Sequence, residues 1–527
     1  MKTFLFAAIA MGLALFPACS RKPSGIDTEI AQELATELAR LNAIPQAGFS
    51  AVDSVPAEIS KFCADCHALP QPSSFVREIW YDEIEKGYEF YARSGRTDLK
   101  PPPLQSVLAF YREHAPSQIN FPQPAEVDHE LRSRFELEQV NWQDGPRLSP
   151  AISCIRWVNF QPEGERRLII TDMRDGSVSM VNPIPKQTKR RLIGRVSNPA
   201  RVIACDLNLD QRTDLIVSDL GSFNPYDHGF GKVVWLNRES SASEFQPTTL
   251  VENLGRVADV AVADFSGDLK PDLLVAEFGH RLTGGIRLMT NDTIDMQPMR
   301  FKEHPILIRP GTMQVSAHDW NQDGEMDFAS ITSQEFECVD VFTNAGDKFD
   351  AYRTWQGGDV TFGLVGFELT DLDQDGDQDI LCVNGDSFDN NFANRSHGVH
   401  WLENIGDLKF RYHRLAELPG AYRAVAVDVD GDNDLDVIVV VNLPTDVYPR
   451  SLVDMNSVSL LMLEQVAPGH FSPRVLERGT PRYAALEAAD FNGDGKVDLA
   501  VGAQLFDTDP PGSAASKLPR LTLWWQK

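Results

Sequence analysis

The sequence predicts a mainly β protein, a seven-bladed β-propeller that follows a small all-α domain. Two observations predict the propeller: an acidic loop that recurs along the chain, and a short alternating strand that follows each copy. A third observation, a single C-x-x-C-H motif in a helical, proline-broken stretch, predicts the α-helical domain. We divide the chain into a leader (1–18), a tether with one helix (19–49), the helical domain (50–117), a linker (118–132) and the propeller (133–527).

The clearest acidic loop runs from Asp371 to Asp379. Oxygen-bearing side chains occupy its positions one, three, five and nine, Gly376 occupies position six, and an apolar strand follows. Ca²⁺ takes about six to eight oxygen ligands at roughly 2.3–2.6 Å, which a tight loop of this kind can supply. Because the carboxylates repel one another without a cation, we expect the ion to contribute to folding.

Five further copies bring the number of candidate calcium loops to six. At positions one, three, five and nine the six loops carry Asp206, Asn208, Asp210 and Asp214; Asp264, Ser266, Asp268 and Asp272; Asp319, Asn321, Asp323 and Asp327; Asp371, Asp373, Asp375 and Asp379; Asp428, Asp430, Asp432 and Asp436; and Asp490, Asn492, Asp494 and Asp498. A seventh copy begins at Asn159 but carries Arg167 at position nine, so we expect no metal there. The first positions are 47, 58, 55, 52, 57 and 62 residues apart, a period that indicates a propeller or a solenoid.

An alternating strand pattern keeps the same period. Its copies begin at Gly176, Gly231, Gly285, Cys338, Gly398, Ser457 and Arg520. Alternation with period two is typical of half-buried strands. With the two strands around each acidic loop and an outer strand such as Phe349–Arg353, each unit has four strands, and seven such units make a propeller. An open solenoid or two separate sheets are the alternatives.

The last unit lacks a fourth strand, because the sequence stops at Lys527 directly after the third. Upstream of the first unit, Arg134–Val140 has the pattern of an unpaired strand. We expect Phe135–Val140 to pair with Arg520–Trp524, which closes the ring and leaves no open sheet edge.

Residues from about 130 to 527 resemble the FG-GAP/VCBS repeat family, whose best-known members are the integrin α-subunit propellers. The resemblance implies calcium at all six loops, with the ligands carried over position by position. Ser266 departs from the family pattern, and Leu269 and Asn433 stand where the family usually has Gly. The loops that begin at 264 and 428 are therefore weaker matches than those at 319, 371 and 490.

The formal net charge of −27 is explained largely by these loops. They contain 20 Asp at ligand positions, and six Ca²⁺ would offset 12 negative charges. The sequence has no basic stripe to neutralise phosphates, so nucleic acid is not an expected partner. Cys154 and Cys205 fall in the first strands of neighbouring units and could pair, although we favour buried free thiols.

The leader predicts export. Met1-Lys2 precedes an apolar run from Phe4 to Phe16, which is too short for a permanent membrane span. Pro17-Ala18-Cys19 resembles a bacterial lipoprotein signal, although Phe16 stands where Leu is typical. The resemblance implies acylation of Cys19 and a periplasmic or cell-surface protein held on the outer membrane by lipid alone.

The sharpest chemical motif is Phe62-Cys63-Ala64-Asp65-Cys66-His67. C-x-x-C-H is the attachment sequence of c-type haem: two thiols join the haem vinyl groups, and the adjacent His binds the iron. A structural zinc site needs a second ligand pair, and a redox dithiol needs a βαβ setting; neither accompanies this stretch. We expect one covalent haem c on Cys63, Cys66 and His67, with a plain disulfide as the alternative.

The helical patterns at Ser74–Tyr91 and Leu104–His114 complete a resemblance to class I cytochromes c over residues 50–117. Such cytochromes usually supply a Met as the sixth iron ligand, but this chain has no Met between Met11 and Met173. The sixth ligand can be absent, His114, Lys100 or a propeller residue. The proline-rich linker predicts that the helical domain packs near the rim or one face of the propeller.

We expect the chain to transfer electrons to or from a redox partner protein, with the propeller as a docking or binding platform. Two alternatives stay open: a haem-dependent oxidoreductase with its active site on the propeller, and a surface binding or adhesion module with a sensor haem. Neither a G-x-S-x-G nor an H-E-x-x-H motif is present, and no acid–base set can be assembled from the sequence.

Overall fold

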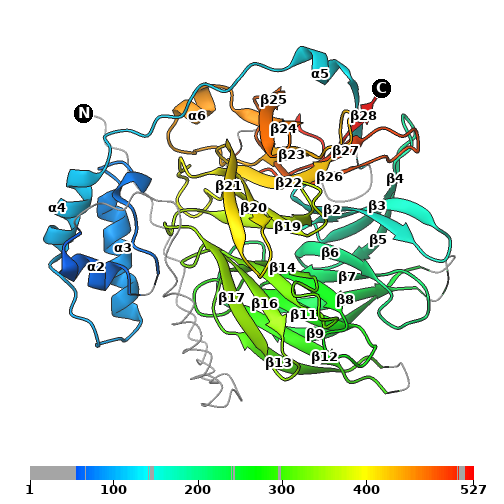
Figure 1. Ribbon diagram of the computed structural model, residues 1–527, viewed down its shortest axis with the longest axis horizontal. Coiled ribbons are helices and arrows are strands. Elements are labelled where there is room, and N and C mark those ends of the chain that lie inside the picture. Colours follow the sequence, from blue (N-terminus) through cyan, green and yellow to red (C-terminus); the bar gives the residue numbers. More distant parts are fainter. Residues whose placement is uncertain are drawn as a thin grey trace.

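The structure, a computed structural model, describes residues 55–65, 67–140, 142, 148–238, 240, 244–294, 298–506, 509 and 517–527. The leader and the tether with its expected helix lie outside these residues. A helical unit lies beside a large β-propeller (Figure 1) and consists of α2 (Ala57–Cys63), α3 (Trp80–Arg93) and α4 (Leu104–His114). None of the described helices is long and apolar enough to cross a membrane.

Seven antiparallel sheets of four strands each form the propeller within the described residues, as the repeat predicted. In chain order the blades are β2 (Ile152–Phe160), β3 (Glu165–Asp172), β4 (Ser177–Asn182) and β5 (Lys189–Arg195); β6 (Pro199–Cys205), β7 (Asp214–Asp219), β8 (Gly231–Asn237) and β9 (Gln246–Leu254); β10 (Val257–Ala263), β11 (Asp272–Glu277), β12 (Gly285–Asn291) and β13 (Phe301–Leu307); β14 (Thr312–Ala317), β15 (Phe328–Thr332), β16 (Cys338–Asn344) and β17 (Phe349–Gln356); β18 (Leu364–Thr370), β19 (Asp379–Asn384), β20 (Gly398–Asn404) and β21 (Phe410–Glu417); β22 (Ala421–Val427), β23 (Asp436–Val441), β24 (Val458–Ala467) and β25 (His470–Arg478); and β26 (Tyr483–Ala489), β27 (Asp498–Ala503), β28 (Leu521–Gln526) and β1 (Phe135–Val140).

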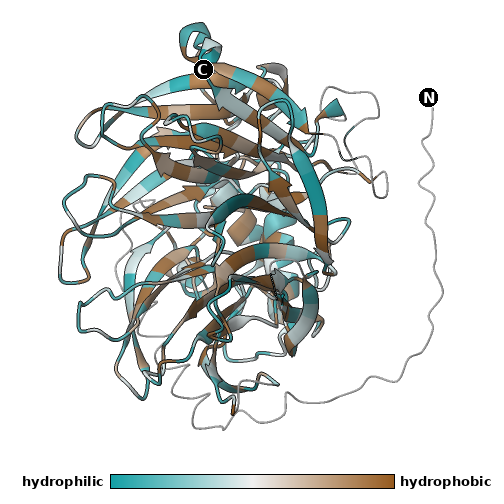
Figure 2. Ribbon diagram, turned by 90° about the vertical axis from the view of Figure 1, so that its right-hand side faces the viewer, coloured by the Kyte–Doolittle hydropathy of each residue, from teal (hydrophilic) through white to brown (hydrophobic). Residues whose placement is uncertain are grey.

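The inner strands are buried more completely than alternation predicts. Both β16 and β19 are buried along their whole length, whereas the outer β9 is largely exposed. Each blade packs between two others, so its middle strands have protein on both faces, and seven apolar clusters each lie between two neighbouring blades. Brown apolar segments accordingly lie mainly in the strands and teal segments in the peripheral loops (Figure 2).

The ring closes where the sequence predicted. β1 pairs with β28 in an antiparallel register that runs from Phe135 opposite Gln526 to Val140 opposite Leu521. The partner strand, Leu521–Gln526, begins one residue later and ends two residues later than the expected Arg520–Trp524. Closure pairs the edge of β28, which would otherwise be open to pairing with other chains, and β1 becomes the outer strand of the last blade.

The helical unit has its own small core, built around Trp80 and Tyr111 with ring centroids 4.2 Å apart. The expected helix from Ser74 is shorter than predicted and begins at Trp80, after a 3-10 turn at Pro72–Ser74. The residues before α3 instead contact the propeller. The Ser74 hydroxyl donates to Asp359, and the Phe75 ring packs edge-on to Phe392 at 5.3 Å.

The linker is packed along the propeller rather than suspended in solvent. Ile119 and Phe121 are buried in the apolar cluster between the fifth and sixth blades. The backbone N–H of Asp128 donates to Val475 at 2.8 Å, and the Asp128 carboxylate caps a short helix, α5 (His129–Ser133). A further short helix, α6 (Ser451–Asp454), lies in the sixth blade. The helical unit is thus attached to the propeller through Ser74 and Phe75 and again through the linker that follows it.

Candidate functional site

A large cavity lies between the helical unit and one face of the propeller, and we call it the interdomain cavity. Its volume is about 710 Å³, within the range of roughly 300–1,000 Å³ that small-molecule and cofactor sites occupy. The helical wall includes Cys63, His67, Trp80, Tyr88, Tyr91 and Tyr111. The propeller wall includes Asp227, His280, Glu337, Asp386, Asp389 and Asn394.

The C-x-x-C-H motif lies on the helical wall. Cys63 is the last residue of α2, and the His67 Nδ1–H donates to the Ala68 carbonyl at 2.7 Å. A carbonyl can only accept, so this bond leaves the lone pair of the imidazole on Nε2, the form that a metal needs. Cys66, the second thiol of the predicted attachment, lies outside the described residues.

Cys63 is not set up as a reactive thiol. Burial raises its pKa to about 11, and the neighbouring Tyr111 hydroxyl has a smaller, opposite effect. Catalytic and redox cysteines depend on a lowered pKa, which generates the thiolate at neutral pH. The environment of Cys63 therefore argues against a redox dithiol.

Aromatic side chains line the helical wall with their hydroxyl groups turned to backbone carbonyls. The Tyr88 hydroxyl donates to Pro102 at 2.6 Å, and the Tyr91 hydroxyl donates to Leu99 at 2.9 Å. Phe62 lies between these two rings, at centroid distances of 5.1 and 5.2 Å. Because the polar ends are already bonded, this wall offers mostly apolar ring faces to a ligand.

Buried carboxyl groups line the propeller wall, and sequence reasoning missed them as a set. Burial raises the pKa of Asp386 to about 7, and the charge of Asp389 adds to the effect. Burial also raises the pKa of Glu337 well above its ordinary value, although one of its carboxylate oxygens accepts the Leu364 N–H at 2.8 Å. These residues come from the neighbouring blades four and five, and the packing of these blades and of the helical unit brings them to one cavity.

The two residues of the helical unit that were candidates for the sixth iron ligand lie away from the cavity. His114 and Lys100 are exposed and do not line the interdomain cavity. The His114 Nδ1 is bonded to the Phe110 carbonyl at 2.8 Å. His280, which the sequence analysis did not single out, does line the cavity from the propeller side.

All six acidic loops have the same backbone. Positions four and six adopt the left-handed conformation in every copy, including Leu269 at φ +66° and Asn433 at φ +76°, so the departures from Gly do not change the loop. Gln211, a third departure at position six that was missed in the sequence, has φ +68°. The carboxylate at position one receives backbone N–H groups from the loop, as at Asp371 from Gly376 at 3.0 Å.

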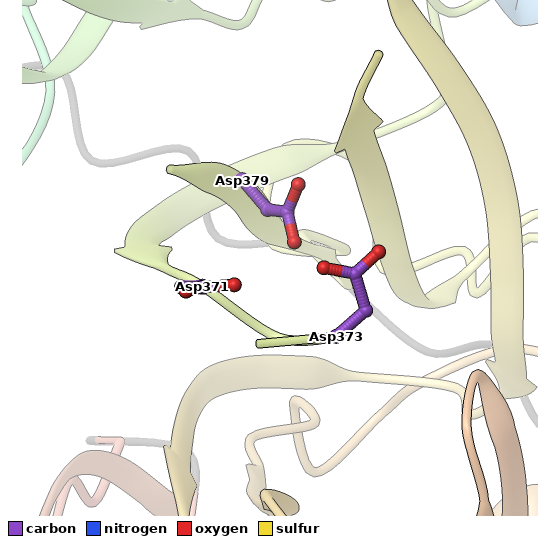
Figure 3. A group of neighbouring side chains, drawn as sticks. All are labelled: Asp371, Asp373 and Asp379. Atoms are coloured by element: carbon purple, nitrogen blue, oxygen red, sulfur yellow. The ribbon is translucent and has the colours of Figure 1, made fainter. Parts of the chain in front are cut away.

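In two loops the described carboxylates converge closely. Oxygens of Asp371, Asp373 and Asp379 lie within 4.8 Å of one another, and so do those of a second group, Asp428, Asp430 and Asp432. In Figure 3 the carboxylates of Asp373 and Asp379 point toward a common space that Asp371 borders on a third side. Oxygen ligands at this spacing suit a hard cation such as Ca²⁺.

The aspartate at position nine is buried in all six loops and also holds the blade together. In Asp379 the two carboxylate oxygens accept N–H groups from Leu372 at 3.0 Å and from Asn404 at 2.7 Å. Burial raises the pKa of Asp379 to about 7. A cation would offset the cost of keeping this buried group charged.

The central channel has charges that compensate one another. The innermost strands carry polar side chains at two positions along the strand: Arg201, Asp259, Gln314 and Arg423 at one, and Arg156, Glu368 and Glu487 at the other. Three Arg balance one Asp and two Glu, and the Arg423 guanidinium pairs with Glu368 at 2.7 Å. The positive and negative side chains in the channel therefore neutralise one another, and they give no support to an active site there.

Cys154 and Cys205 are both free, so the pairing considered above does not form. Cys154 is buried and Cys205 is half-buried, and burial raises the pKa of Cys205 to about 12. The interpretation as small apolar residues fits both positions.

One family model matches the chain: residues 483–516 are similar to the FG-GAP repeat. The match covers β26, the loop from Asp490 to Asp498, and β27. No curated protein matches the chain at a significant level. Because the other five acidic loops share the backbone of the matched loop, the β part of the chain is a seven-bladed propeller with an FG-GAP repeat in its last blade.

Proposed function

We propose that the chain is an exported c-type cytochrome joined to a calcium-binding FG-GAP/VCBS propeller, and that it transfers electrons to a redox partner protein. The observation that carries this proposal is the position of the C-x-x-C-H motif. Cys63 and His67 line an aromatic cavity that the propeller closes from the other side. The motif alone could lie on any surface, whereas a cofactor needs an enclosing pocket of suitable size.

The cavity residues fit a covalent haem. His67 keeps the Nε2 lone pair for the iron, because its Nδ1–H is bonded to Ala68. Cys63 is a buried, protonated thiol beside ring faces, which suits a thioether to a flat apolar group. Four basic side chains also line the cavity, each ion-paired with a protein carboxylate that a haem carboxylate would have to replace: Lys86, Arg93, Arg96 and Arg281.

When bound, a haem supplies a one-electron couple at its iron, whose potential the protein sets through axial ligands and burial. The residues of this chain hold and shield the group. Trp80, Tyr88 and Tyr111 exclude water from the helical side, and the propeller face covers the other. Burial of this kind limits solvent reorganisation, which suits electron transfer rather than reaction with solutes.

We further propose calcium at the six acidic loops. The shared left-handed backbone, the converging carboxylates of Asp371, Asp373 and Asp379, and the raised pKa of the buried position-nine aspartates support it. The ions would hold the blade edges and thereby the propeller face that borders the cavity. Calcium is thus assigned a structural rather than a catalytic role.

The proposed location follows from the leader. Acylation of Cys19 would hold the protein on the outer membrane, in the periplasm or at the cell surface, where haem attachment to thiols takes place. A Cys19→Ser variant should leave the membrane fraction and appear as soluble protein. If it stays with the membranes, the lipid anchor is wrong.

Two measurements test the electron-transfer proposal. The purified full chain is denatured, extracted with acidified organic solvent and stained for haem on a gel; haem that stays with the polypeptide is the expected result. Stopped-flow absorbance then follows reduction of the protein by a soluble c-type cytochrome of lower potential. Absence of covalent haem, or no electron exchange with that cytochrome, would overturn the proposal.

A haem-dependent oxidoreductase is the second candidate, and the carboxyl groups of Glu337, Asp386 and Asp389, which all line the cavity, favour it. A carboxylate beside the haem could take the proton that a substrate releases on oxidation. Such an enzyme needs an open iron position. High-spin oxidised protein, together with rapid carbon monoxide binding by the reduced form, would favour this candidate or a sensor over the electron carrier.

A further inference from the structure

We propose that His280 of the propeller is the second axial ligand of the haem, an inference that rests on the proposed function. His280 and His67 line the same cavity from its two walls, one from the propeller and one from the helical unit. A haem bound between them would join the two parts of the chain through its iron. The propeller would then be part of the haem site and more than a platform.

The imidazole of His280 is polar and half-buried. Its Nδ1 is buried and receives no hydrogen bond among the described residues. A buried polar atom without a protein partner costs free energy, and a bound water, ion or ligand is one explanation for it. His228 is bonded, its Nε2 lying 2.7 Å from the Ser222 hydroxyl, whereas His397 also lacks a partner but does not line the cavity.

The loop that carries His280 is held in one conformation. The Asp227 carboxylate accepts the backbone N–H groups of Arg281, Leu282 and Thr283 at 2.9–3.0 Å. Gly279 has φ +61°, and a Cβ there would collide with the Thr283 carbonyl, so only Gly allows this turn. A rigid loop can position an iron ligand without paying for its ordering on binding.

The same loop is attached to the helical unit. The Arg281 guanidinium lies over the Phe90 ring of α3 at 4.5 Å and pairs with Glu335 at 3.0 Å. His280 is therefore placed relative to α3, and through it relative to the C-x-x-C-H motif. The contact is made by the residue adjacent to the proposed ligand.

The other candidates fit less well. His114 and Lys100 are exposed and outside the cavity lining. Lys86 lines the cavity, but its ammonium pairs with Glu83 at 2.7 Å. Among the described lining residues, His67 and His280 are the only histidines and no Met is present. Burial also lowers the pKa of His280, which keeps the imidazole neutral and able to bind a metal.

The test compares His280→Ala with His114→Ala in the full-length holoprotein. A gel stain for covalent haem first establishes that each variant carries the group, which separates this test from that of the proposed function. We expect a low-spin spectrum for the wild type and His114→Ala, and a high-spin spectrum with rapid carbon monoxide binding for His280→Ala. A high-spin wild type, or a His280→Ala variant that stays low-spin, would overturn the assignment although the haem is present.

Two further measurements keep the test decisive if His280→Ala folds poorly. Added imidazole should restore the low-spin spectrum of His280→Ala by occupying the vacated position. A His280→Met variant should remain low-spin with a higher reduction potential, because a thioether ligand raises the potential relative to imidazole. An unchanged potential in His280→Met would contradict ligation by His280.

Discussion

The acidic loops and the interdomain cavity are built in opposite ways. Each loop is a local structure: Asp371 and Asp379 are eight positions apart, and the left-handed residues between them bring their carboxylates together. The cavity joins Cys63 of α2 to Glu337 and Asp386, which lie hundreds of residues later on other blades. Repeated local structure can be read from spacing, whereas a site made by docking two domains cannot.

The two regions should also differ in what stabilises them. A calcium loop should depend on its ion and affect mainly its own blade. The cavity should depend on the fit between the helical unit and the propeller face, through contacts such as Phe75 with Phe392. The following predictions are ordered from the largest expected effect to the smallest.

The double variant Cys63→Ala/Cys66→Ala should lose all covalent haem, because no thiol remains to form a thioether. Haem staining of a denaturing gel measures the loss. Calcium content should stay at the wild-type level, since the loops do not contact the motif. Loss of both haem and calcium would show that the two regions are coupled and would contradict the view that the loops are independent of the cavity.

Deletion of residues 130–142 should cause aggregation, because it removes β1 and leaves the edge of β28 unpaired. Light scattering during purification and after heating measures this effect. Deletion of the helical domain up to residue 118 is the control, and it should leave a soluble, closed ring that retains Ile119 and Phe121. Equal solubility of the two variants would place closure elsewhere.

Chelation of calcium should lower the melting temperature of the propeller. An ion at a hundred times its Kd stabilises the folded state by about 2.7 kcal/mol, so several ions together should give a large shift. Asp375→Ala should remove part of the shift, and Asp407→Ala, at an exposed position outside the loops, should not. Fewer than about four calcium ions per chain, with no chelator effect on melting, would contradict the assignment.

Protonation of His400 should contribute to acid unfolding. The imidazole is buried between the Tyr412 hydroxyl at 2.8 Å and Asn384 Oδ1 at 2.6 Å, and burial lowers its pKa to about 3. The unfolded chain binds the proton near pH 6.5, so the stabilising contribution is complete above that pH and falls as the pH drops toward 3.

The measured quantity is the slope of the free energy of unfolding between about pH 6 and pH 4. His400→Gln should make the wild-type slope shallower by up to about 1.4 kcal/mol per pH unit, one proton's worth. The comparison uses slopes because the substitution also changes packing at neutral pH. Identical slopes would mean that His400 is charged in the folded protein.

The sequence predicted the propeller well because its signals repeat. The eroded loop at Asn159 would mean little alone, but with six intact copies and a strand after each of the seven it gives seven blades. The start of α3 was wrong because Ser74 and Phe75 have helical patterning but are taken up by contacts with Asp359 and Phe392. Tertiary contacts of this sort produce no periodic pattern in the sequence.

His280 shows the same limit at the site. Its only local signal is a loop between Gly279 and Gly284, and many loops of the chain contain two Gly. Glu337 and Asp386 gave no signal in the sequence either, since nothing there distinguishes an isolated Asp or Glu that will be buried from one that will be exposed. They became a set only when the loops of several blades met below the helical unit.

The amino-acid sequence by itself determined the number of blades, the strand that closes the ring, and the six loops with their candidate calcium ligands. These features depend on short-range spacing and on a strand pattern, and each repeat of both is contained within about 60 residues of chain. Only the tertiary structure decided which propeller residues face Cys63 and His67. That choice depends on how one domain docks on another, and docking is set by shape and burial over many distant side chains.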